Sequence, residues 1–241
     1  FAALESRSSV EAIAFDSFTE AVGELRNAIG NALANQSGAG LRDAMESALQ
    51  VAMNTSNTEF GGEKIFGGVR AYDAPFVSSD INTLAAQANT DPNWIDTGPN
   101  RTITLEDGRT VELSKSASEI FRPFVDFIVD MRKWENTNGA MTGKLTTAQL
   151  TYLQSQATAI VPIQTEALDN QASSGIMARQ ISSVKEANLL KVDAFDNIVG
   201  SVQNVDMAEV ATKLSAAQTQ YQASASIFAK LKDLNLLNFL R

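Results

Sequence analysis

Apolar residues recur at helical spacing along most of the chain. The first run, spaced by three or four residues, predicts one buried face of a helix over about 10–33. Its members are Phe15, Phe18, Val22, Leu25, Ile29 and Leu33. The polar, glycine-containing stretch "NQSGAG" (35–40) ends this pattern, and a second helix is predicted over 41–57.

Four glycines lie within the stretch "NTEFGGEKIFGG" (57–68), directly after the second predicted helix. A phosphate-binding loop would place its lysine directly after the second glycine of the motif, with Ser or Thr next, whereas Lys64 is followed by Ile65. We therefore predict a turn that leads into a short strand or hairpin, without phosphate or metal. Phe60 and Phe66 are expected to pack back on the helices.

Helical spacing is lost over 69–113, where Pro75, Pro92 and Pro99 lie. The segment "RTITLEDGRTVEL" (101–113) alternates apolar and polar residues around Asp107 and Gly108, which predicts a hairpin. This region is predicted to be a small β-containing insertion. Helical spacing returns from Ser114 and ends in "ENTNGAMTG" (135–143).

A helical pattern then persists from about Thr146 to Arg241, interrupted only at Pro162, Gly175 and Gly200. Such length predicts a rod or a coiled coil. Its clearest part is a heptad seam made by Val210, Leu214, Ala217, Tyr221, Ser224, Phe228 and Leu231. Beyond the seam the apolar positions shift around the helix to Leu234, Leu237 and Phe239.

The predicted fold class is mainly α: an elongated antiparallel helical bundle or coiled coil with a small β-containing inserted domain. The helices of 10–33, 41–57 and 147–200 are expected to pack together. Their predicted core residues are Phe15, Phe18, Val22, Leu25, Leu49 and Ile181. Four parts are expected: 1–68 (N-terminal helices), 69–113 (insertion), 114–204 (returning helices) and 205–241 (C-terminal assembly helix).

Composition limits the function. The net charge of −9 over 241 residues argues against nucleic acid as a partner, because no basic surface neutralises phosphates. No apolar run is long enough to span a membrane. The chain has no cysteine and no histidine, which removes thiolate and imidazole chemistry. We predict no enzymatic activity, no cofactor and no metal site, and, since Phe1 is not Met, a missing N-terminal piece.

A carboxylate-dependent hydrolase or a sugar-binding surface protein is the alternative from another class, because Asp and Glu are plentiful. Its ligand site would involve Tyr72, Asp73 and Asp91 near Trp94. In the competing interpretation the acids form a solvated surface and Trp94 anchors a loop.

The C-terminal stretch (205–241) resembles that of bacterial flagellins and of the flagellar hook-associated protein 3 family. That family has an acidic "D-x-A-E" start, a "Q-T-x-x-x-A-S" middle and an "L-x-L-L-N-F/Y-L" end. The matching residues are Asp206, Ala208, Glu209, Gln218, Thr219, Ala223, Ser224, Leu234, Leu236, Leu237, Asn238, Phe239 and Leu240.

The glycine-rich stretch is similar to the "F-G-G" element of the hook-associated branch, which precedes a proline and an aromatic residue, as in "NTEFGGEKIFGGVRAYDAPF" (57–76). The resemblance covers about 41–76 and 146–241. One departure is at the front, where the family has a further segment that pairs with the C-terminal helix.

The resemblance implies a structural subunit of the bacterial flagellum, the hook–filament junction protein, with filament flagellin as the alternative. It implies export through the flagellar type III apparatus to an extracellular location. The implied partners are hook-associated proteins, flagellin and copies of the chain itself, and an export chaperone is compatible with it. The expected assembly interface comprises Leu214, Tyr221, Phe228, Leu231, Leu234, Leu237 and Phe239.

Overall fold

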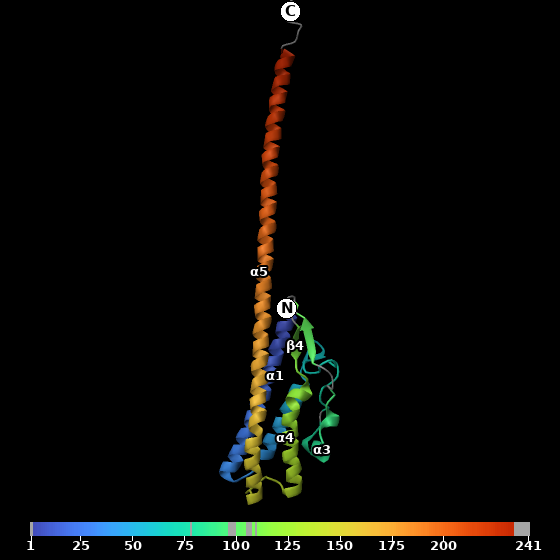
Figure 1. The fold of residues 1–241 in the computed structure, drawn as a ribbon, viewed down its shortest axis with the longest axis vertical. Coiled ribbons are helices and arrows are strands. Elements are labelled where there is room, and N and C mark those ends of the chain that lie inside the picture. The colour runs from blue at the N-terminus through green and yellow to red at the C-terminus, as the bar shows by residue number, and fades with distance from the viewer. Residues whose placement is uncertain (1, 78, 96–99, 105–107, 109, 234–241) are drawn as a thin grey trace, which may run out of the picture. The chain divides into compact units, whose positions relative to one another are not determined.

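The computed structural model describes residues 2–77, 79–95, 100–104, 108 and 110–233. The described helices are α1 (Ala2–Asn35), α2 (Leu41–Ser56), α3 (Ile81–Ala86), α4 (Ala117–Asn138) and α5 (Thr147–Asp233), with a short 3₁₀ turn, η1, at Asp91–Asn93 (Figure 1). Two antiparallel hairpins join β1 (Glu59–Phe60) to β2 (Glu63–Lys64) and β3 (Arg101–Thr104) to β4 (Thr110–Ser114). The predicted mainly α class with a small β part is confirmed.

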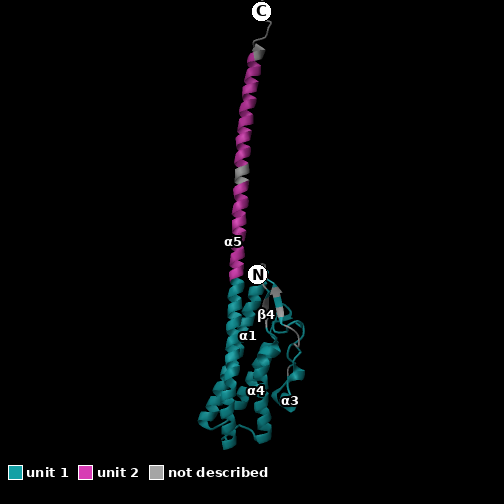
Figure 2. Ribbon diagram, viewed as in Figure 1, with its two compact units in different colours: residues 1–182 teal, residues 183–241 magenta. Residues whose placement is uncertain are grey.

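Contacts divide the chain into two compact units, residues 1–182 and 183–241 (Figure 2). The first unit holds α1 to α4, the hairpins and the beginning of α5. The described part of the second unit consists of the remainder of α5. The four parts expected from the sequence, with boundaries after residues 68, 113 and 204, stay a prediction.

The core of the first unit contains all six side chains that the sequence placed there, each at most 4% exposed. Five phenylalanines meet edge to face at its centre, with Phe15 packed on Phe66 at 5.5 Å. The ring of Phe18 lies 4.7 Å from that of Phe121 and 5.5 Å from that of Phe124, and Phe66 lies 5.0 Å from Phe121. This cluster joins α1, α4 and the glycine-rich stretch, because Phe66 belongs to the last of these.

Helix α5 differs from its prediction in two respects. It is continuous through Pro162, Gly175 and Gly200, although an interruption was expected at each. Ile160, close to Pro162, is fully buried, and such burial on the seam offsets the roughly 3 kcal/mol that an interior proline costs. The buried seam also ends near Ile181, so the expectation that the helix packs as far as residue 200 was wrong.

The seam of α5 in the first unit repeats every seven residues. Its buried members are Leu153, Ile160, Ala167, Ser174 and Ile181. It lies against α1, where Arg26 donates to the Gln164 side chain and Gln171 donates to Asp16. The same face of α5 continues without interruption in sequence, but its apolar side chains beyond residue 188 are exposed. Periodicity alone does not reveal which part of a seam has a partner.

The glycine-rich stretch is a hairpin, as predicted. Gly61 (φ 63°) and Gly62 (φ 84°) form the turn between β1 and β2, and both need the left-handed conformation that glycine adopts easily. Phe66 is fully buried and Phe60 packs against the core, as expected. The Asn57 side chain then holds the following segment, because its amide accepts from the Phe76 N–H at 3.0 Å and donates to the Phe76 carbonyl at 2.9 Å.

The loops α1–α2 and α4–α5 pair at one end of the first unit. The Gly38 N–H donates to the Gly143 carbonyl at 2.8 Å, and the Leu145 N–H donates to Gln36 at 2.9 Å. Glu135 is buried beside them and accepts from the Met141 N–H at 2.8 Å. Arg132 and Arg42 both lie within salt-bridge distance of its carboxylate, so α2, α4 and the α4–α5 loop share one polar anchor.

We predict that Gly67→Ala and Gly68→Ala each destabilise the protein by about 1–3 kcal/mol. Gly68 has a φ of 56°, whereas a Cβ at Gly67 would lie 2.9 Å from the Arg70 carbonyl oxygen. At position 67, glycine is therefore required by close packing of the backbone and not by a positive φ. Urea denaturation followed by circular dichroism measures both effects.

Gly30→Ala is the matched control, because a Cβ there meets nothing within 4 Å inside α1. It should stabilise the protein by about 0.5–1 kcal/mol through helix propensity. Unchanged stability in both turn variants would contradict the role assigned to these glycines.

Candidate assembly surface

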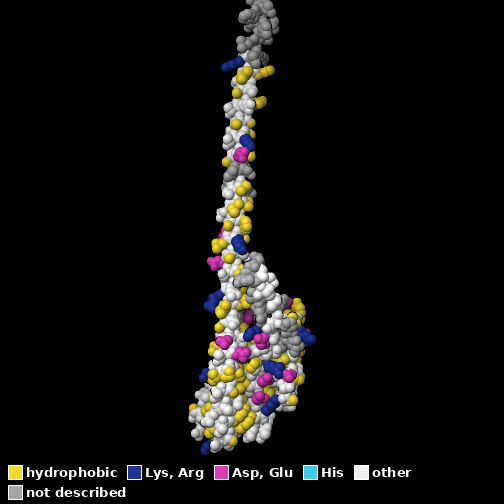
Figure 3. Space-filling model, in the orientation of Figure 1, with side chains coloured by type: hydrophobic (Ala, Val, Ile, Leu, Met, Phe, Trp, Pro, Cys, Tyr) yellow, Lys and Arg dark blue, Asp and Glu magenta, His cyan; other side chains and the backbone are white. Residues whose placement is uncertain are grey.

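The second unit presents large apolar side chains to solvent along α5 (Figure 3). Of the predicted interface, Leu214 is 57% exposed, Tyr221 77% and Phe228 74%. Leu234, Leu237 and Phe239 lie outside the described residues, and so does the side chain of Leu231. The described members therefore share the exposure that an assembly surface needs, while their role in assembly stays a prediction.

This surface begins earlier along α5 than the predicted interface does. Val192, Phe195, Val199 and Val202 are each more than half exposed. Phe228 follows Val192 by 36 residues, which is ten turns of a straight α-helix. At 100° per residue, all of these side chains and Val210, Leu214 and Tyr221 fall within an arc of about 120°. We call this set the apolar stripe; the spacing of three and four residues from Val192 was the available signal.

The helix around the later part of the stripe is poor in charge. Between residues 210 and 229 the only charged residue is Lys213, which pairs with Glu209 at 2.8 Å. The remaining positions of this segment are Ala, Ser, Thr, Gln and apolar residues. A helix exposed to water normally carries charges on its polar face, whereas interface centres are depleted of them. The composition is thus typical of a helix that a neighbour covers.

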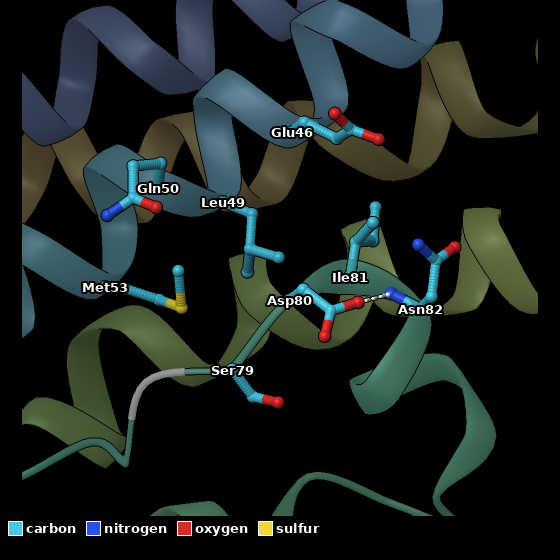
Figure 4. A pocket seen from close by; sticks show the side chains of 8 residues that line it. All are labelled: Glu46, Leu49, Gln50, Met53, Ser79, Asp80, Ile81 and Asn82. Carbon is cyan, nitrogen blue, oxygen red and sulfur yellow. Dashed lines mark hydrogen bonds between the residues drawn. The ribbon is translucent and has the colours of Figure 1, made fainter.

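A cavity of about 360 Å³ lies between α2 and the start of α3 (Figure 4). Leu49, Met53 and Ile81 supply its apolar lining, and Glu46 and Asp80 bring carboxylates. Asp80 is the N-cap of α3, where its side chain accepts from the Thr83 hydroxyl and from the Asn82 and Thr83 N–H groups. The hydrogen bond from the Thr83 side chain is the largest of the contributions that lower the Asp80 pKa. This carboxylate therefore serves a cap rather than acid catalysis.

Two of the residues considered for a sugar or hydrolase site, Trp94 and Asp91, have structural roles. Trp94 is 5% exposed, packs on Phe76 with ring centroids 4.5 Å apart, and donates to the Thr90 hydroxyl. Asp91 forms an ion pair with Arg122 of α4. Trp94 thus anchors the segment that carries it on the core, as the competing interpretation held. Tyr72 and Asp73 are exposed, and the Tyr72 hydroxyl bonds to Glu63.

Among the residues that the structure describes, Glu11 is the carboxylate whose pKa is raised toward that of an acid catalyst. Burial raises the pKa of Glu11 from 4.5 to about 7, and Arg7, whose guanidinium lies 3.6 Å away, partly opposes the shift. Ser8, one turn earlier on α1, is also buried. Glu11 therefore belongs to a polar part of the helix packing and does not line the cavity between α2 and α3.

Among the residues that the structure describes, no group of three or more Asp or Glu side chains is placed to hold a metal ion. The described helices also include none with the length and hydropathy needed to cross a membrane.

Residues 158–240 match the family model of the bacterial flagellin C-terminal helical region. The crystal structure of FlgL from Bacillus cereus is similar to this chain with a TM-score of 0.58 and 14% sequence identity. That alignment covers 77% of this chain and 84% of FlgL. No curated protein sequence matches the chain. The likeness to FlgL shows a shared fold, and the family match confirms the resemblance found in the C-terminal sequence.

We predict that the folded state loses stability as pH rises from about 4.5 to 7. The folded protein holds the Glu11 proton more tightly than the unfolded chain does, so ionisation above the unfolded pKa favours unfolding. The loss should be about 2–3 kcal/mol. Urea denaturation at pH 5 and pH 8 measures it.

Glu11→Gln should remove most of this dependence, because the amide has no proton to lose. Glu24→Gln, on the exposed face of the same helix, should leave the dependence as it is. An equally steep dependence in Glu11→Gln would show that other groups cause it.

Proposed function

We propose that this chain is the structural subunit that joins hook and filament in the bacterial flagellum. The match of residues 158–240 to the family model of the bacterial flagellin C-terminal helical region supports a structural role in the flagellum. The junction role rests on the "F-G-G" element at residues 66–68 and is compatible with the fold shared with FlgL.

The exposed apolar stripe is the observation that carries the proposal. Burying one large apolar side chain contributes roughly 1.5–3 kcal/mol, so leaving the whole stripe in water is costly. A solitary helix in water also has little intrinsic stability. Both costs disappear when neighbouring helices cover the stripe. A subunit that buries its apolar stripe only in the assembly is therefore stabilised by assembling.

In this proposal the neighbours are copies of the chain, other hook-associated proteins and flagellin. The subunit is exported through the flagellar type III apparatus, with a chaperone as a compatible partner before export. It functions outside the cell and carries out no chemistry. Filament flagellin is the alternative role, since the matched family model is that of flagellins. Immunogold electron microscopy distinguishes the two: label confined to the junction supports the first role, and label along the filament supports the second.

We predict that Leu214→Glu abolishes incorporation into the flagellum and motility, because it places a charge in the stripe. Thr212→Glu is the matched control. Thr212 is exposed, lies two residues away and points to the opposite side of the helix, about 160° from Leu214. Swimming assays and electron microscopy of a strain that expresses each variant give the result, and circular dichroism checks that both fold.

Deletion of residues 228–241 is a second test. The first unit, residues 1–182, should stay folded, because its core contains none of the deleted residues. Cells should then shed filaments or fail to build them. Normal filaments from the Leu214→Glu protein or from the truncated protein would refute the proposed function.

A further inference from the structure

The sequence contains a single Asn–Gly pair, Asn138–Gly139, which lies at the end of α4. Both residues are exposed to solvent. Deamidation of asparagine is fastest before glycine, because glycine has no side chain to hinder attack of its backbone nitrogen on the preceding side-chain amide. The pair is therefore the point of this chain at which that reaction is expected first.

Both reacting groups are held by hydrogen bonds to the last turn of α4. The Asn138 side-chain nitrogen donates to the Trp134 carbonyl at 3.0 Å, and the Gly139 N–H donates to the Glu135 carbonyl at 2.9 Å. Asn138 is also the last helical residue of α4. In a helical backbone its side-chain carbon cannot approach the Gly139 nitrogen along the direction that ring closure requires. The reaction therefore has to wait until this turn opens.

Two buried side chains hold the residues that follow Asn138. Gln149 donates to the carbonyls of Gly139 and Ala140 at 3.2 and 3.3 Å, and Glu135 accepts from the Met141 N–H at 2.8 Å. Gln149 is 5% exposed and Glu135 is 3% exposed. Opening the turn disturbs bonds made by these buried groups, so it costs more than the fraying of a free helix end.

We propose that Asn138–Gly139 is a latent deamidation site, which the folded protein protects and the unfolded chain exposes. In the open turn the Gly139 nitrogen attacks the side-chain carbon Cγ of Asn138. A C–N bond forms, the bond between Cγ and Nδ2 breaks, and ammonia leaves with the proton that the Gly139 nitrogen gives up. Water then opens the cyclic imide at either of its carbonyl carbons, and the product is aspartate or isoaspartate.

Either product weakens the end of α4. Aspartate lacks the amide donor to the Trp134 carbonyl and places a negative charge beside the C-terminal carbonyls of the helix, where the helix dipole disfavours it. Isoaspartate also routes the main chain through the former side chain, which inserts an extra carbon atom before Gly139. The bonds of Gln149 and Glu135 depend on the present path of the main chain. Conversion in the unfolded chain therefore lowers the stability of the protein that refolds afterwards.

Mass spectrometry of the full chain tests the protection. The protein is kept at mildly alkaline pH, once native and once in guanidinium chloride, and is then digested with trypsin. The tryptic peptide 134–144 contains Asn138 and also the exposed Asn136, whose next residue is threonine. Asn138 should convert at least about tenfold more slowly in the native protein, the ratio that 1.4 kcal/mol of opening free energy produces. Equal rates in the two states would overturn the proposal, and so would faster conversion of Asn136 than of Asn138 in the unfolded chain.

Gln149→Ala tests whether the buried bonds provide the protection. It should speed conversion in the native state at least about threefold, because the turn loses hydrogen bonds, and leave the rate in guanidinium chloride unchanged. Gln154→Ala, at an exposed position of α5, is the control and should change neither rate. A Gln149→Ala chain that circular dichroism shows to be unfolded should convert as fast as the denatured wild type. A native rate unchanged by Gln149→Ala would contradict the protection.

Refolding after conversion tests the consequence. Wild-type chain held in guanidinium chloride until Asn138 has converted should refold to a protein with a lower urea midpoint than fresh chain. Asn138→Gln chain treated in the same way is the control, because glutamine would have to close a larger and less favoured ring. A treated wild-type chain as stable as the fresh one would show that conversion leaves α4 intact, and the proposed consequence would be wrong.

Discussion

A helix can keep an apolar face only where another element covers it, and this constraint governs the two parts of α5. Between Leu153 and Ile181 the face lies against α1 and the side chains are buried. From Val192 to Phe228 the described chain leaves the corresponding side chains exposed. The unfavourable exposure is not a defect of the fold but a driving force that remains available, because apolar area released from water on association stabilises the associated state.

The sequence predicts the packed helices well because large apolar side chains recur at the spacing of a single helix face. Phe15, Phe18 and Ile181 were placed in the core on period alone, and they are there. The expectation that the helix packs as far as residue 200 extended this reasoning beyond Ile181, and Phe195 within that range is 65% exposed. Periodicity reports that a face will be covered, but the identity of the covering element depends on tertiary contacts that local spacing does not encode. The continuity of α5 through Pro162 has a similar origin. Buried residues before and after the proline, Ile160 and Ala167, hold the helix together although proline disfavours a helix interior.

Turns were predictable where the backbone conformation requires a particular residue type. Gly61 and Gly62 need a positive φ, and a two-residue turn between short strands is the usual reason for such a pair. The hydrogen bonds between Asn57 and Phe76 were not readable in the same way. They depend on how the segment that contains Phe76 folds back on the end of α2. A polar side chain that satisfies a distant backbone group leaves no periodic signal.

The distribution of charge links the fold to assembly more directly than apolarity does. Single exposed apolar residues are common on soluble proteins, so Leu214 or Val161 alone would carry little weight. Long helical segments without charge are harder to explain in a chain of net charge −9, because solvent-facing positions are where charges cost least. The segments 147–165 and 214–229 both lack charged residues. The centres of protein–protein interfaces are depleted of charge in the same way, and segments with this property occur in both parts of α5.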